Sequence, residues 1–123
     1  MGDLSDHFSS SEFECKCGCG FDSVDPELIV LLEKIRGFVG GPVRINSGCR
    51  CESHNNSVGG AKHSVHKLGQ AADIRVEGGW HRRRVLDAAV ACGAEGIGVA
   101  RTFIHVDVHE GSPEVARPSA WSY

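Results

Sequence analysis

The spacing of apolar residues predicts two amphipathic helices. Leu28, Leu31, Leu32, Ile35 and Phe38 recur at the three- and four-residue intervals of one helix face. Asp25 and Pro26 form a favourable start for this helix, and the Gly-Gly-Pro run at 40–42 ends it. A second helical pattern covers residues 80–92, with Val85 on its apolar side.

Four shorter stretches have the composition or the alternation of strands. They cover residues 43–46, 71–76, 97–100 and 103–108, and the last two are expected to form a hairpin around Arg101 and Thr102. Residues 1–24 are expected to be loop-rich, 55–60 to be turn-rich and 110–123 to form an irregular tail. Because helices and strands are mixed without a repeated strand–helix–strand order, the pattern predicts one α+β domain over residues 1–123, a small antiparallel sheet with flanking helices.

Composition and charge exclude several classes of function. The 123 residues carry a formal net charge of −3 with no long basic run, so we expect no nucleic-acid partner. The basic residues at 81–84 are interpreted as the solvated face of the second helix. No stretch approaches the roughly 20 apolar residues that span a bilayer, and the polar first 11 residues do not resemble a signal peptide. We therefore expect a monomer made in the cytoplasm, without a membrane partner.

Six cysteines are many for a chain of this length. Cys15, Cys17 and Cys19 form one group, Cys49 and Cys51 form a second, and Cys92 stands alone on an apolar helix face. Disulfides between the two groups are one interpretation, and a structural zinc held by four thiolates is another. Reduced, partly buried thiols are the third interpretation.

The stretch SVHKLGQAAD at residues 64–73 carries the first candidate metal ligands. It places His66 and Asp73 seven positions apart, and Gly69 permits the chain to turn between them. Asp73 also lies in an apolar strand, where a carboxylate is costly unless it is paired or bound to a metal. His66 and Asp73 can therefore meet at one ion.

The stretch FIHVDVH at residues 103–109 supplies a third candidate ligand. Strand alternation places His105, Asp107 and His109 on one face, with aliphatic residues on the other. Two imidazoles and one carboxylate, with a fourth position left for water, form the ligand set of a catalytic zinc site. The alternative is that these histidines lie on a solvated strand face and bind nothing.

The pattern Ser-x-His-x-x-Gly-x-Ala-x-Asp, followed by a strand with a further histidine, resembles the zinc D-alanyl-D-alanine carboxypeptidases and related phage peptidoglycan endopeptidases. Their fold is shared with the zinc-bearing domain of Hedgehog proteins. The resemblance runs from about residue 13 to residue 108, including SGCR at 47–50, His54-Asn55 and VGGA at 58–61. It implies this fold and one Zn²⁺ per chain, held by His66, Asp73 and His105.

The resemblance also implies roles for residues near the metal. Arg50 matches an arginine that grips a substrate carboxylate, which suits a bidentate guanidinium, although a structural ion pair is the alternative. Ser64 matches the motif serine, which either bonds substrate or shapes the turn.

One departure from the family pattern concerns the catalytic base. Family carboxypeptidases usually carry an Asp or Glu three residues before the last zinc ligand, and that position here is Thr102. Asp107 is the nearest substitute, either as the base or as the group that orients a zinc-binding histidine. Weaker candidates for the base are His63, Glu95 and His109.

These residues imply a zinc metallopeptidase that hydrolyses D-amino-acid-containing stem peptides or cross-links of peptidoglycan, as a carboxypeptidase or an endopeptidase. The small size and polar N-terminus favour a phage or prophage lysis enzyme, an endolysin that acts on the cell wall after release. Two alternatives remain. One is a zinc-containing wall-binding module whose catalysis is lost at Thr102, and the other is a tail-tip component of a phage particle.

Overall fold

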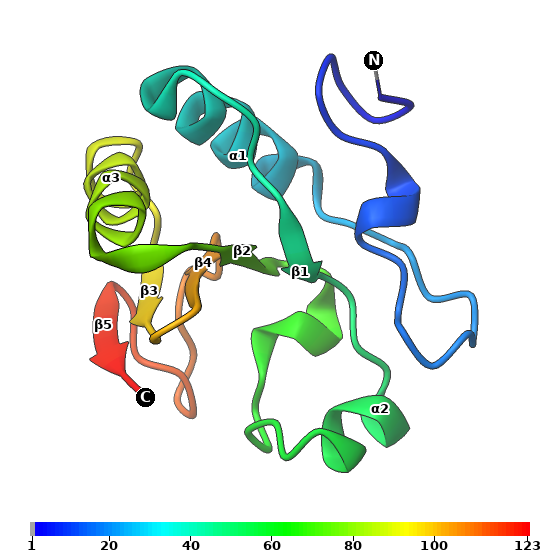
Figure 1. The fold of residues 1–123 in the computed structure, drawn as a ribbon. Helices are drawn as coiled ribbons and strands as arrows, with labels where there is room; N and C mark the ends of the chain where they lie inside the picture. Colours follow the sequence, from blue (N-terminus) through cyan, green and yellow to red (C-terminus); the bar gives the residue numbers. More distant parts are fainter. Residues whose placement is uncertain (1) are drawn as a thin grey trace.

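The computed structural model describes residues 2–123, in which two helices cover one face of a five-stranded sheet (Figure 1). The helices are α1 (Pro26–Val39), α2 (Glu52–Ser57) and α3 (Gly78–Ala91), with 3₁₀ turns η1 (Ser10–Glu12) and η2 (Val65–Leu68). The strands are β1 (Ile45–Ser47), β2 (Ala71–Arg75), β3 (Gly96–Val99), β4 (Phe103–Asp107) and β5 (Ser119–Ser122). This architecture confirms the predicted α+β class.

The sheet has the strand order β1-β2-β4-β3-β5. The first four strands pair antiparallel, as predicted, and β3 and β4 form the expected hairpin. The fifth strand corrects the prediction, because β5 lies parallel to β3 and makes the sheet mixed.

The tail over residues 110–123 is therefore not irregular throughout. Ser119 pairs with Gly96 and Ser122 with Val99, along the free edge of β3. The hydrogen-bonding groups of a sheet edge need partners, and this segment supplies them although it lacks a continuous apolar run. Alternate residues of β5 are half-buried and exposed, which is the period of a strand.

Helix α1 begins and ends where the sequence predicts. The side chain of Asp25 accepts a hydrogen bond from the backbone N–H of Glu27 at 2.9 Å, and Gly40 closes the helix in the left-handed conformation at φ 79°. The predicted apolar face is buried at Leu28, Leu31, Leu32 and Ile35. Phe38 is the exception, since its position in the last turn leaves it 48% exposed.

The core lies between α1, α3 and one face of the sheet. It includes Leu32 and Ile35 of α1, Val85 and Ala88 of α3, and Ile74, Ile104 and Val106 of the two central strands. These strand residues alternate with Asp73, His105 and Asp107, whose side chains therefore point to the opposite face. The apolar packing of one face thus holds the polar residues of the other in fixed positions.

Helix α2 was not predicted, and its second half overlaps the stretch at 55–60 for which only turns were expected. Six residues are too few to show a helical period in the sequence. Asn55 secures the segment that follows α2, because its fully buried side chain donates a hydrogen bond to the carbonyl of Ala61 at 2.9 Å. This places the turn at 58–61 beside the polar face of the sheet, as part of the wall of one cavity.

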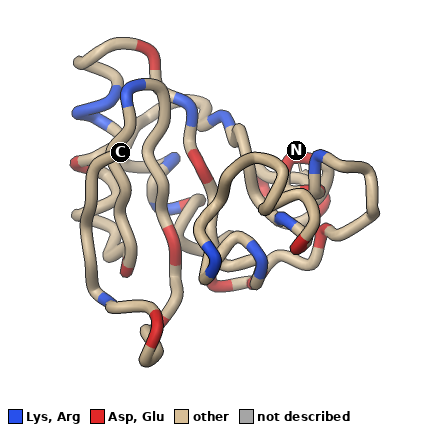
Figure 2. The backbone as a smooth tube through the Cα atoms, turned by 90° about the horizontal axis from the view of Figure 1, so that it is seen from below, with Lys and Arg blue, Asp and Glu red and all other residues tan. Residues whose placement is uncertain are grey.

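Basic and acidic residues are interspersed along the backbone in Figure 2, in keeping with the small net charge. Among residues 2–123, no helix is both long enough and apolar enough to cross a membrane.

Candidate metal centre

Antiparallel pairing of β2 with β4 places Asp73 directly opposite His105. Directly opposed residues on one face of a sheet lie close enough for their side chains to interact. Oδ1 of Asp73 is 3.3 Å from Nδ1 of His105. Both residues are buried, and the register therefore joins the carboxylate of one predicted ligand to the imidazole of another.

His66 reaches the same point from η2, just before β2. Ser64 caps this turn, its hydroxyl accepting from the N–H of His66 at 3.3 Å. Gly69 ends it at φ 70°, where an added Cβ would also collide with the carbonyl of Ser23. The turn that the sequence assigns to Gly69 is present, and it leaves Nε2 of His66 3.3 Å from Oδ1 of Asp73.

Hydrogen bonds to the far nitrogens of both rings settle which nitrogens face Asp73. Nδ1 of His66 lies 2.7 Å from the carbonyl oxygen of Gly48, which can only accept, so this nitrogen carries the proton. Nε2 of His105 lies 2.7 Å from Oδ2 of Asp107 and donates to that carboxylate. In the neutral rings, the nitrogens that face Asp73 therefore present lone pairs.

Three acceptor atoms thus converge without a donor between them. The candidate ligand atoms of His66, Asp73 and His105 all lie within 4.8 Å of one another. Oδ1 of Asp73 is buried and has no hydrogen-bond partner among the described residues. Lone pairs that face one another repel unless a cation lies between them, and two imidazoles with one carboxylate suit Zn²⁺. The three side chains therefore fit the metal that the sequence implies.

Both carboxylates of this region are ionised at neutral pH. Burial would raise the pKa of Asp73, but positive charge on the His105 and His66 rings outweighs burial and holds that pKa well below its usual range. When both rings are neutral, a cation bound between the three groups would supply that positive charge instead. Burial likewise opposes ionisation of Asp107, yet His105 and Arg117 lower its pKa.

Asp107 lies behind the metal centre rather than in the cavity. It is fully buried, and both of its oxygens are bound by Arg117, through Nε at 3.0 Å and a terminal nitrogen at 2.7 Å. Arg117, Asp107 and the imidazole of His105 are therefore connected by consecutive hydrogen bonds. The arrangement favours the orienting role that the sequence left open for Asp107 over the role of base.

Arg50 contacts the other oxygen of Asp73. Its guanidinium donates to Oδ2 of Asp73 at 3.3 Å, to Oδ1 of Asn55 at 3.1 Å and, through Nε, to the hydroxyl of Ser47 at 3.2 Å. The structure thus divides the two oxygens of Asp73 between Arg50 and the two histidines. Arg50 makes the structural ion pair that was the alternative to substrate binding.

A cavity of about 740 Å³ opens over the three candidate ligands. Its wall includes Arg50 and Ser64, the two residues that the resemblance assigns to substrate, together with His54, His63 and Lys16. Asp73 is the only carboxylate residue along this wall within the described part of the chain.

The opposite part of the wall comes from the C-terminal segment, whose role the sequence did not predict. Trp121 packs against the ring of His105 with centroids 5.0 Å apart, and Tyr123 packs against Phe103 at 5.1 Å. Arg117 lies over the Trp121 ring, 5.1 Å from its centroid. The signal that could have found them is the pair of aromatic residues two positions apart, a strand period.

Thr102, at the position of the family's acidic residue, and two of the weaker candidates for the base lie outside this cavity. Thr102 lines a separate cavity beside Arg75 and Glu77. His109 places Nδ1 2.8 Å from the side chain of Gln70, and the backbone of Glu95 bonds to Asp107 and Ser119. Of the weaker candidates named from the sequence, His63 alone lies on the wall of the cavity over the metal centre.

Comparison with known proteins agrees with this geometry. The family model of peptidase M15 matches residues 6–107. The peptidoglycan L,D-endopeptidase MepK of Escherichia coli strain K12 is 35% identical over 94 residues, which cover 69% of this chain and 51% of that protein. The MepK proteins of Escherichia coli O157:H7 and Shigella flexneri match to the same extent.

The chain spans about half the length of the curated relatives it matches. The matched region contains the three candidate ligands, Arg50 and Asp107, and it ends before β5. On the extent of the family match and the identity to these relatives, the chain belongs to the M15 family of peptidases.

Proposed function

We propose that this domain is a zinc-dependent peptidoglycan endopeptidase that cuts a peptide bond in D-amino-acid-containing stem peptides or cross-links. The observation that carries the proposal is the convergence of His66, Asp73 and His105 at the wall of a large cavity, with a buried carboxylate oxygen that lacks a donor. Peptidoglycan as the substrate class is supported by membership of the M15 family and by the similarity to relatives that are named peptidoglycan endopeptidases.

In this proposal each protein group near the metal has one task. A Zn²⁺ bound by the three ligands would act as a Lewis acid on the scissile carbonyl and supply a nucleophilic water near neutral pH. Gly48 and Asp107 hold the two imidazoles in the required orientation. Arg50 holds the remaining oxygen of Asp73, so that the carboxylate cannot rotate away.

The bonding of Arg50 suits an endopeptidase better than a carboxypeptidase. The resemblance implies that a carboxypeptidase would hold the terminal carboxylate of its substrate with the arginine at this position, rather than with Lys16 elsewhere on the wall. Arg50, the arginine at the predicted position, already donates to three protein acceptors. Peptides with a free and with an amidated C-terminus should therefore be cut at rates within a few-fold of each other. Strict dependence on the free carboxylate would contradict the endopeptidase assignment.

A histidine of the cavity wall is proposed to accept the proton of the attacking water. Apart from the candidate ligands, the histidines along this wall are His54 and His63, and imidazole is the most common general base in enzymes. Replacing the essential one by alanine should lower kcat by about 10²–10⁴-fold with zinc retained. If neither His54→Ala nor His63→Ala lowers kcat, this assignment is wrong.

A wall-binding module without catalysis is the second candidate. The observation that favours it is the lack of any carboxylate other than Asp73 along the described cavity wall. Such a module would bind purified peptidoglycan and zinc, and it would release no new peptide ends. The phage or prophage origin, the release to the cell wall and the monomeric state stay predictions.

The deciding experiment compares the wild-type chain with His66→Ala. The wild type should release new amino groups from purified peptidoglycan, and the variant should lose that activity together with the metal at this centre. His81→Ala is the matched control, because His81 bonds the backbone of Glu77 outside the cavity. Peptide release that survives both His66→Ala and a chelator would contradict the proposal.

A further inference from the structure

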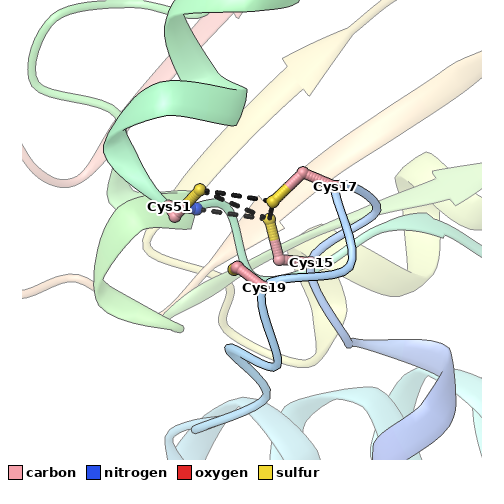
Figure 3. Close-up of side chains that lie close together, drawn as sticks. All are labelled: Cys15, Cys17, Cys19 and Cys51. Atoms are coloured by element: carbon pink, nitrogen blue, oxygen red, sulfur yellow. Dashed lines mark hydrogen bonds between the residues drawn. The ribbon is translucent and has the colours of Figure 1, made fainter.

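Four of the six cysteines gather at one point, away from the three predicted ligands of the catalytic metal. Cys15, Cys17 and Cys19 come from the N-terminal segment, and Cys51 comes from the start of α2 (Figure 3). Their sulfur atoms all lie within 4.8 Å of one another. The two groups of cysteines thus meet, but through Cys51 rather than through Cys49.

The distances between the sulfurs suit a shared metal. Cys17 lies 3.5 Å from both Cys15 and Cys51, and Cys15 lies 3.8 Å from Cys51, measured between Sγ atoms. A disulfide needs about 2.05 Å between its sulfurs. Four thiolates around Zn²⁺, each about 2.3 Å from the ion, stand about 3.8 Å apart at the corners of a tetrahedron.

Backbone N–H groups around the cluster are placed to stabilise thiolates. The N–H of Cys51 points at Sγ of Cys15 at 3.4 Å, and the N–H of His54 points at Sγ of Cys51 at 3.4 Å. Hydrogen bonds from backbone amides stabilise negative sulfur, and the second of them lies at the first turn of α2. Gly18, at φ 81°, turns the loop so that the cysteines on either side of it face one centre.

The remaining two cysteines take no part. Cys49 is buried in the hydrophobic core, and Cys92 is half-buried against it beyond the end of α3. Their separation from the cluster provides a matched control within the same chain.

We propose that Cys15, Cys17, Cys19 and Cys51 bind a second Zn²⁺ as a structural site. No step of the proposed peptidase reaction depends on this ion, and the inference does not rest on the proposed function. The site joins the N-terminal segment to α2, two parts of the chain that are otherwise separated by 31 residues between Cys19 and Cys51.

The second site would shape the wall of the cavity. Lys16, which lies between two of the cysteines, and His54, in the first turns of α2, both line that cavity. Arg50, the partner of Asp73, directly precedes Cys51. A zinc at the cysteines would therefore hold in place the part of the wall that the sheet does not support.

Metal content of the full chain, purified under reducing conditions, is the first test. The wild type and Cys92→Ser should each contain about two zinc ions per chain, whereas Cys17→Ser and His66→Ala should each contain about one. Cys17 is exposed, so its replacement by serine does not disturb the core. The His66→Ala result separates this proposal from the proposed function, because that variant should keep the zinc of the cysteines.

Cobalt substitution identifies the ligands of the second ion. The wild type and His66→Ala, loaded with Co²⁺, should show an intense sulfur-to-cobalt charge-transfer band, and Cys17→Ser should have lost most of it. An organomercurial added to the unmodified wild type should release about one zinc ion per chain, a result that needs no variant. Failure to release zinc, a wild type without the charge-transfer band, or an intact mass that shows disulfides among these cysteines would each overturn the proposal.

Discussion

Nε2 of His105 lies 2.7 Å from Oδ2 of Asp107, which is itself bound by Arg117, and this bond turns Nδ1 of the same ring toward Asp73. Asp107, two residues along the same strand, therefore holds the proton of His105 on Nε2 and leaves a lone pair on the Nδ1 that faces Asp73. A carboxylate behind the metal-binding histidine raises the basicity of that ligand and fixes its ring.

The first prediction concerns Asp107→Asn. The amide keeps the shape of the side chain but removes its charge, so we expect metal affinity to fall about 10–100-fold. Competition with a chromogenic chelator measures that affinity, and Asp87→Asn is the control because Asp87 pairs with Arg83 on the exposed face of α3. If Asp107 were the base, kcat would fall while metal affinity stayed unchanged.

The second prediction distinguishes the two roles of Ser64. Its hydroxyl caps η2 and accepts from the N–H of His66. Ser64→Ala should lower the free energy of unfolding by about 1 kcal/mol, as measured by denaturant titration. KM for a stem peptide should change less than about twofold. A large rise in KM with unchanged stability would instead indicate that Ser64 binds substrate.

The third prediction tests the wall that β5 contributes. Trp121→Ala removes the ring packed against His105 and should raise KM several-fold with zinc retained. Trp80→Ala is the matched control, because Trp80 is 77% exposed on α3 and lies outside the cavity. Equal kinetics for the two variants would show that the C-terminal segment does not contact the substrate.

The fourth prediction concerns the turn that positions His66. Gly69→Ala combines a left-handed backbone with a collision against Ser23, and it should cost at least about 1–2 kcal/mol of stability. Gly37→Ala is the control of opposite sign, because that helical glycine has open space around it and alanine should stabilise α1 by about 0.5–1 kcal/mol. Thermal unfolding of both variants measures the difference. A Gly69→Ala protein as stable as the wild type would contradict the assigned strain.

Much of the fold could be predicted because its signals are local. Helix α1 is marked by Asp25, Pro26 and Gly40, and each acts on the backbone within one turn. The period of strand β4 likewise placed His105 and Asp107 on the face opposite the core, where the structure has them. Helix α2 was missed because six residues are too few to show a helical period, and β5 was missed because it lacks a continuous apolar run.

Part of the candidate site could also be predicted from the sequence. His66, Asp73 and His105 were selected by residue type and spacing, and the structure brings the three together. The positions of Arg50 and Ser64 on the cavity wall agree with the resemblance, but their bonding partners could not be foreseen. Partners depend on side-chain orientation after folding, which spacing does not specify.

Residue order alone was thus enough for the α+β class, the main helices and the three candidate ligands, because propensity, capping and alternation act between near neighbours. Folding was needed to bring Arg117 to Asp107, Trp121 to His105 and Cys51 to Cys15. Such contacts join residues that are distant in the chain or lie on different elements. They form only when the packed core sets the strands in register and brings the chain ends beside them.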